Sequence, residues 1–168
     1  MSSSTPPIAF EDARLLAARG QAAEASETLD RLLEREPAHV PALLLKAQLQ
    51  LDAREGEDAL SFYERARQAA PESAETWNGL ARCLHALGRD EAALRAGQHA
   101  RSLLGQGDNF RHAASVYLTL VWCLREMRQY REALELATEG LERCPDAILA
   151  QWASLVEEEL AESQKEEC

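Results

Sequence analysis

Hydrophobic positions in residues 74–107 follow the three- and four-residue spacing of a helix, in two successive stretches. In the first stretch, Trp77, Leu80 and Leu84 fall on one side of a helix, together with Ala81. Gly88 then interrupts the pattern. The second stretch places small residues on its inner face, namely Ala93, Gly97 and Ala100. The pattern therefore predicts two antiparallel helices joined by a tight turn.

The same pattern recurs along the chain at a fixed spacing. Counting back 34 residues from Ala93 gives Ala59, and another 34 gives Ala25, while Pro71 and Pro37 are also 34 apart. Downstream the frame resumes after 40 residues, which is 34 plus an insertion of six. We expect the two helices of each repeat to cross closely at small residue pairs: Ala13/Ala25, Ala47/Ala59, Ala81/Ala93 and Val121/Ala133.

Residues 74–107 resemble one tetratricopeptide (TPR) repeat, whose pattern is W-x2-L-G-x2-Y, then A-x3-F, then P. Trp77, Leu80 and Ala93 match that pattern. The usual Gly, Tyr, Phe and Pro are replaced by Ala81, Leu84, Gly97 and Gly105. The resemblance implies an all-α, right-handed solenoid of about four helix-turn-helix repeats plus a C-terminal capping helix, nine helices in total.

This frame predicts a division of the whole chain into repeats and flanking segments. The expected segments are a disordered N-terminus at 1–5, repeats at 6–39, 40–73, 74–107 and 114–147, an insertion at 108–113, a capping helix at 148–162 and a frayed tail at 163–168. We expect the insertion to start the next helix earlier, with Phe110 and Ala113 inside it. A longer loop is the alternative.

Composition and charge narrow the class of protein. The 168 residues amount to one domain, and a formal net charge of -11 opposes binding to nucleic acid. The sequence shows no secretory signal and no apolar run long enough to span a membrane, so we expect a cytoplasmic protein without membrane insertion. We expect a monomer or a weak dimer.

The sequence offers little chemistry for catalysis. It contains no phosphate-binding loop, no H-E-x-x-H and no G-x-S-x-G motif, and its four histidines do not pair at metal-ligand spacings. We interpret Cys83 and Cys123, which occupy equivalent positions in successive repeats, as small buried apolar groups. No cofactor, metal or enzymatic activity is expected.

The resemblance implies a binding surface, because in TPR proteins the first helix of each repeat lines a concave groove. The corresponding positions hold Arg14, Gln48, Asn78, Arg82, His85, Leu118, Trp122 and Arg125. Three arginines in one groove would suit an extended or carboxylate-bearing peptide, with Asn78 holding its backbone and Trp122 offering a flat apolar surface. Alternatively, Trp122 fills space near the insertion and Arg82 pairs with a neighbouring Glu.

The same comparison argues against one specialised ligand. TPR co-chaperones that bind the EEVD tail of heat-shock proteins need Lys, Asn and Arg at fixed columns, which here hold Phe10, Arg14, Leu45, Glu75 and Gly79. A heat-shock tail is therefore not expected. Two functions remain open: an adaptor or scaffold that binds a peptide or helix of a partner protein, and a small acidic chaperone of a secreted client, similar to those of type III secretion.

Overall fold

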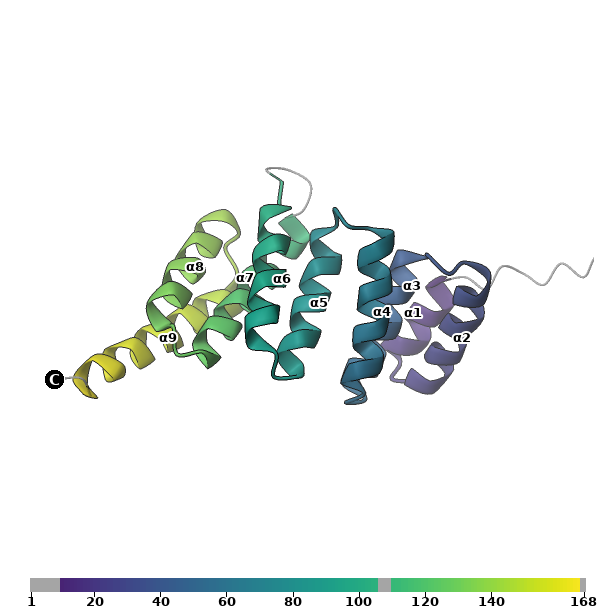
Figure 1. The fold of residues 1–168 in the computed structure, drawn as a ribbon, viewed down its shortest axis with the longest axis horizontal. Helices are drawn as coiled ribbons and strands as arrows, with labels where there is room; N and C mark the ends of the chain where they lie inside the picture. Colours follow the sequence, from purple (N-terminus) through teal and green to yellow (C-terminus); the bar gives the residue numbers. More distant parts are fainter. Residues whose placement is uncertain (1–9, 106–109, 167–168) are drawn as a thin grey trace, which may run out of the picture. The chain divides into compact units, whose positions relative to one another are not determined.

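The computed structural model describes residues 10–105 and 110–166 of the chain (Figure 1). These residues form nine α-helices and no strand, which confirms the predicted all-α class. The chain divides into two compact units, Met1–Pro71 and Glu72–Cys168.

The first unit consists of two helical hairpins. Helices α1 (Phe10–Ala18) and α2 (Ala22–Arg35) form one, and α3 (Val40–Asp52) and α4 (Gly56–Ala69) form the other. Their shared core contains Leu29, Leu32 and Leu43, with Phe10 and Leu44 packed at its margin. These two marginal side chains are half-buried, because α1 and α3 turn them toward the core.

The second unit contains two further hairpins and a last helix. Helices α5 (Ala74–Ala86) and α6 (Asp90–Ser102) form one hairpin, and α7 (Phe110–Glu126) and α8 (Tyr130–Arg143) form the other. Helix α9 (Ala147–Glu166) packs against both α7 and α8. The core of this unit includes Tyr117, Leu120, Val121 and Leu149, all fully buried.

Small residues allow the helices of each hairpin to approach closely. All eight residues of the four predicted crossing pairs are fully buried, from Ala13 and Ala25 to Val121 and Ala133. Glycine serves the same purpose in α8. A β-carbon on Gly140 would lie 2.7 Å from Cγ of Tyr117 and 2.7 Å from Cδ2 of Leu149. The absence of a side chain at Gly140 therefore lets α8 pack closely against both α7 and α9.

The turn inside every hairpin uses the same backbone conformation. Gly20 and Gly88 take positive φ angles of 77° and 70°, and Arg54 and Arg128 take 64° and 58° at the equivalent positions. In each turn the next amide donates to the carbonyl five residues back, as from Gln21 to Leu16 at 3.0 Å. This is the Schellman ending of a helix, which needs a left-handed residue. The left-handed conformation therefore recurs at the same repeat position whether that position holds Gly or Arg.

Prolines end three of the four second helices, as expected. Glu36, Ala70 and Cys144 each precede a proline, and their ψ angles of 75°, 72° and 95° lie outside the helical region. A residue before proline avoids the helical region because the proline ring clashes with it. Gly105 stands in the proline position after α6, where the helix ends at Ser102.

Two predicted boundaries can be compared with the helices. Helix α7 has 17 residues whereas α5 has 13, so residues 110–113 extend the helix as predicted, and a loop there is wrong. Helix α9 continues to Glu166 instead of ending near 162, because no Gly or Pro interrupts it. The predicted disorder at 1–5, the start of the insertion at 108–109 and the last two tail residues lie outside the described residues.

Candidate functional site

Helix α7 of the second unit contacts both α5 and α9. One aromatic ring from each of these three helices joins a continuous row. The ring centroids of His85 and Trp122 are 5.3 Å apart, and those of Trp122 and Trp152 are 5.8 Å apart. The interplanar angles of 44° and 50° give tilted contacts, which aromatic pairs prefer to face-to-face stacking.

Trp122 is the most accessible member of the row. Its side chain is 43% exposed, whereas His85 and Trp152 are half-buried. Val121 and Cys123 on either side of it are fully buried, so the helix directs Trp122 away from the core. An exposed tryptophan that is already held on two sides presents a fixed apolar surface.

Asp90 fixes the orientation of His85. Nδ1 of His85 lies 2.7 Å from Oδ1 of Asp90, the first residue of α6. The carboxylate also lies at a helix N-terminus, where the helix dipole favours a negative charge. The Nδ1 atom of His85 is thus already used by a contact within the chain.

Arg125 is held in the same way at the other side of Trp122. Its guanidinium donates to Glu159 of α9 at 2.5 to 3.0 Å and to Glu126 at 3.1 Å. The hydrogen bonds to Glu159 raise the pKa of Arg125 further. The guanidinium also lies 5.5 Å from the ring centroid of Trp152 and covers that ring. Arg125 is therefore already paired with acidic side chains within the chain, and its role in ligand binding stays a prediction.

Arg82 lies between two contacts that join α5 to α7. Four residues before it, the side-chain amide of Asn78 donates to Ser115 of α7 at 2.9 Å. Three residues after it comes His85, which contacts Trp122. Arg82 is half-buried, and within residues 10–105 and 110–166 its guanidinium has no hydrogen bond or ion pair. The alternative that Arg82 pairs with a neighbouring Glu is therefore not observed there.

Asn78 has a different environment from the one predicted. It is only 5% exposed, because its amide is packed against α7 and bonded to Ser115. Its Oδ1 atom is buried without a hydrogen-bond partner in the described part of the chain. Asn78 thus connects α5 to α7 and does not offer an accessible amide to a ligand backbone.

Leu118, one turn before Trp122, is half-buried against the core of the second unit.

The remaining predicted site residues belong to the first unit. Arg14 on α1 is exposed and pairs with Glu11 at 2.7 Å, and Gln48 on α3 donates to Asp52 at 2.6 Å. These contacts are local to α1 and α3 and do not involve the aromatic row of the second unit. A role for Arg14 and Gln48 in binding stays a prediction.

Sequence reasoning missed two contributors to this site. The sequence pattern assigns Trp152 to the packing face of the capping helix and Glu159 to its polar end. Trp152 and Glu159 are seven residues apart, which is about two turns of α9. This spacing alone indicates that they lie on the same face of the helix. Their contacts with α7 could not be read from spacing alone, because they depend on how α9 packs.

The three cysteines that the structure describes are buried, as expected for Cys83 and Cys123. Cys83 and Cys123 are fully buried and Cys144 nearly so, and none of these three forms a disulfide. Burial, with a smaller contribution from the charge of Asp90, raises the pKa of Cys123 to about 12. In the part of the chain that the structure describes, no cluster of His, Cys, Asp and Glu could hold a metal ion.

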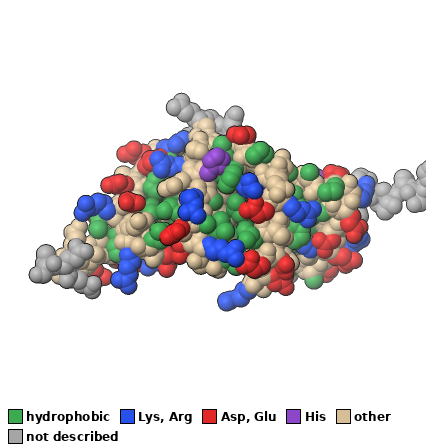
Figure 2. Space-filling view, in the orientation of Figure 1, with side chains coloured by type: hydrophobic (Ala, Val, Ile, Leu, Met, Phe, Trp, Pro, Cys, Tyr) green, Lys and Arg blue, Asp and Glu red, His purple; other side chains and the backbone are tan. Residues whose placement is uncertain are grey.

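The described surface carries charges of both signs. On the face shown in Figure 2, Lys and Arg side chains alternate with Asp and Glu and do not gather in one basic field. Among the described helices, none is long and apolar enough to cross a membrane.

Several solved structures share the fold. YrrB, described as a TPR protein with an unusual peptide-binding site, is 20% identical with a TM-score of 0.66, over 88% of this chain and 73% of that one. PilF of Pseudomonas aeruginosa is 19% identical with a TM-score of 0.78, over 91% and 68%. TTC0263 of Thermus thermophilus is 18% identical with a TM-score of 0.75, over 95% and 84%.

Comparison of the sequence with curated proteins gave no match. Comparison with models of protein families, in contrast, identifies the family. Two tetratricopeptide repeat models match the chain, at residues 10–74 and 72–146, and together they cover most of its length. The chain belongs to the tetratricopeptide repeat family.

Proposed function

We propose that this chain is a non-catalytic adaptor that binds a peptide or a helical segment of a partner protein on the face formed by α5, α7 and α9. The observation that carries the proposal is the exposure of Trp122 between the rings of His85 and Trp152. Interaction with other proteins is general among TPR proteins, and the face formed by α5, α7 and α9 is our proposal for where it occurs in this chain.

The fixed orientation of Trp122 suits it to bind a partner. A tryptophan that is fixed in one orientation loses little conformational entropy when a partner covers it, and such residues often dominate binding energy. Trp122 is not part of the hydrophobic core of the second unit, so the packing of that core does not require this ring. The printed description of YrrB as a peptide-binding TPR protein is consistent with a peptide as ligand.

The other predicted groove residues take different roles in the proposal. Arg82, His85 and Leu118 contact the ligand with Trp122, while Arg125 and Asn78 position α9 and α5 against α7. We place the protein in the cytoplasm as a monomer or weak dimer, with no cofactor, and we do not expect binding to nucleic acid.

The test is affinity capture from extract of the native cell with three forms of the full chain. Trp122→Ala is expected to weaken partner binding by at least ~2 kcal/mol while helicity by circular dichroism is unchanged. Leu15→Ala is the matched control, because Leu15 is 49% exposed and lies in the other unit. Capture that is equal for all three forms would refute the site. Capture of one secreted client would favour the chaperone alternative over the adaptor.

A further inference from the structure

We propose that the face of α5, α7 and α9 recognises an extended segment in which an internal Asp or Glu and a bulky aromatic residue stand two or three residues apart. The carboxylate pairs with Arg82 and the ring packs on Trp122. This inference rests on the proposed function and specifies the chemistry of its ligand.

The cationic side chains of this face differ in whether they already have an acidic partner, and this difference favours a carboxylate in the ligand. Arg125 is neutralised by Glu159 and Glu126, and His85 is paired with Asp90. Arg82 differs from them because it has no acidic partner in the described residues. A half-buried guanidinium interacts more strongly with a carboxylate than an exposed one does, because less water surrounds the pair.

One guanidinium suits one side-chain carboxylate in the interior of a peptide. The neighbouring side chains of Arg82 on α5 are Asn78, which is bonded to Ser115, and His85, which is bonded to Asp90. Neither supplies a second positive charge that is free for the ligand. A C-terminal tail with two adjacent carboxylates would leave one of them without a partner, so we assign the site to an internal residue.

The aromatic side chain of the ligand packs where one of the three rings, His85, Trp122 or Trp152, is exposed. Trp152 is covered by the guanidinium of Arg125, and His85 is fixed by Asp90. Trp122 is the exposed ring of the three. A ligand ring therefore packs on Trp122 in a tilted or offset arrangement, without displacing a contact within the chain.

The distance between adjacent helices sets the spacing in the ligand. Arg82 and Trp122 lie on neighbouring helices that contact each other, and packed helix axes are about 8–10 Å apart. An extended peptide advances about 3.3 Å per residue. A carboxylate and a ring that stand two or three residues apart therefore match the separation.

The test begins with a random peptide library displayed on phage and selected on the full-length chain. Selected peptides are expected to carry Asp or Glu two or three residues from Phe, Tyr or Trp. Arg82→Glu should weaken such a peptide at least about thirtyfold. Replacing the acidic residue of the peptide by Lys should then recover at least about tenfold on Arg82→Glu.

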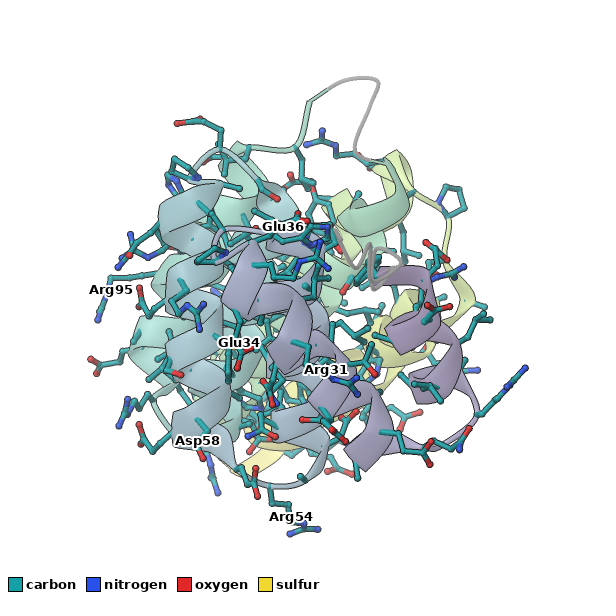
Figure 3. All side chains as sticks on the ribbon, turned by 90° about the vertical axis from the view of Figure 1, so that its right-hand side faces the viewer. Arg31, Glu34, Glu36, Arg54, Asp58 and Arg95 are labelled. Carbon is teal, nitrogen blue, oxygen red and sulfur yellow. The ribbon has the colours of Figure 1, made fainter. Side chains whose placement is uncertain are left out.

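Arg95→Glu is the matched control, because Arg95 is exposed on α6 and extends outward (Figure 3). It makes the same charge change and should leave the affinity unchanged. If selected peptides depend on Trp122 but bind Arg82→Glu as tightly as wild type, or show no recovery with Lys, this inference is wrong and the proposed function stands. If no peptide is selected that depends on Trp122, both are refuted.

Discussion

Arg125 on α7 is bonded to Glu159 on α9 by three hydrogen bonds of 2.5 to 3.0 Å. The two residues join the last helix of the chain to α7, and the guanidinium packs on Trp152 of the same α9. Both side chains are less than a third exposed, so the pair is screened less than a surface pair.

Glu159→Gln is expected to lower the free energy of unfolding by about 1 kcal/mol, because the charge-assisted bonds to Arg125 are lost. Thermal unfolding followed by circular dichroism measures this change. Glu158→Gln is the matched control on the preceding residue, which is exposed. Equal melting temperatures for both variants would show that the pair contributes nothing to the attachment of α9.

Gly140→Ala is expected to destabilise the second unit by about 1–3 kcal/mol, because the added methyl group meets Tyr117 and Leu149 at 2.7 Å. Urea unfolding measures the loss. The control is Gly105→Ala, since no atom lies within 4 Å of a β-carbon there. The prediction fails if both alanine variants have the same midpoint.

Arg54→Gly should stabilise the protein by about 1 kcal/mol, because glycine takes a positive φ without the steric cost that arginine bears. Figure 3 shows the Arg54 side chain extending outward from its turn, so little contact is lost. Calorimetry of the full chain would measure the gain. The reverse change, Gly20→Ala, should cost a similar amount, and a stabilising effect there would contradict the explanation.

Alkaline pH is expected to destabilise the second unit. Burial raises the pKa of Tyr117 above its usual 10.0, with a further increase from its hydrogen bond to Glu139, and burial raises the pKa of Cys123 from 9.0 to about 12. The folded state keeps these protons after the unfolded chain has lost them. Their stabilising contribution is therefore complete below about pH 9 and is lost as pH rises toward 12.

A urea titration at several alkaline pH values would measure this loss. Tyr117→Phe and Cys123→Ala together should flatten the dependence of unfolding free energy on pH, even if the double variant is less stable at neutral pH. An unchanged slope would show that other groups control alkaline unfolding.

An EEVD peptide is expected to bind no better than a scrambled peptide of the same composition, because Glu75 and Gly79 stand where the clamp requires cationic side chains. Isothermal titration calorimetry distinguishes the two peptides. Sequence-dependent binding in the micromolar range would contradict this expectation.

Much of the fold could be predicted because it depends on repeat spacing and small residues. The bounds of α2, Ala22–Arg35, agree with the stretch between Gly20 and Pro37. The four crossing pairs were predictable since only small residues fit where helices cross. The left-handed turns at Arg54 and Arg128 were not, because arginine carries no signal for positive φ.

The candidate site was less predictable because it depends on contacts between helices. Spacing placed Trp122 and Arg82 on one face, but it could not show that Asn78 is used by Ser115. It also could not show that Glu159 neutralises Arg125, since that pair depends on the path of α9. Which charges remain free was therefore decided by tertiary packing.

The reaction of the buried cysteines with a thiol reagent measures how often the second unit unfolds locally. All four cysteines of the sequence lie after residue 72, so a thiol reagent modifies only that half of the chain. Cys83 and Cys123 are fully buried and react only when the structure around them opens. Their labelling rates would give the opening free energy of this half while the other remains attached. Comparison with the global unfolding free energy would then show whether the two halves melt together.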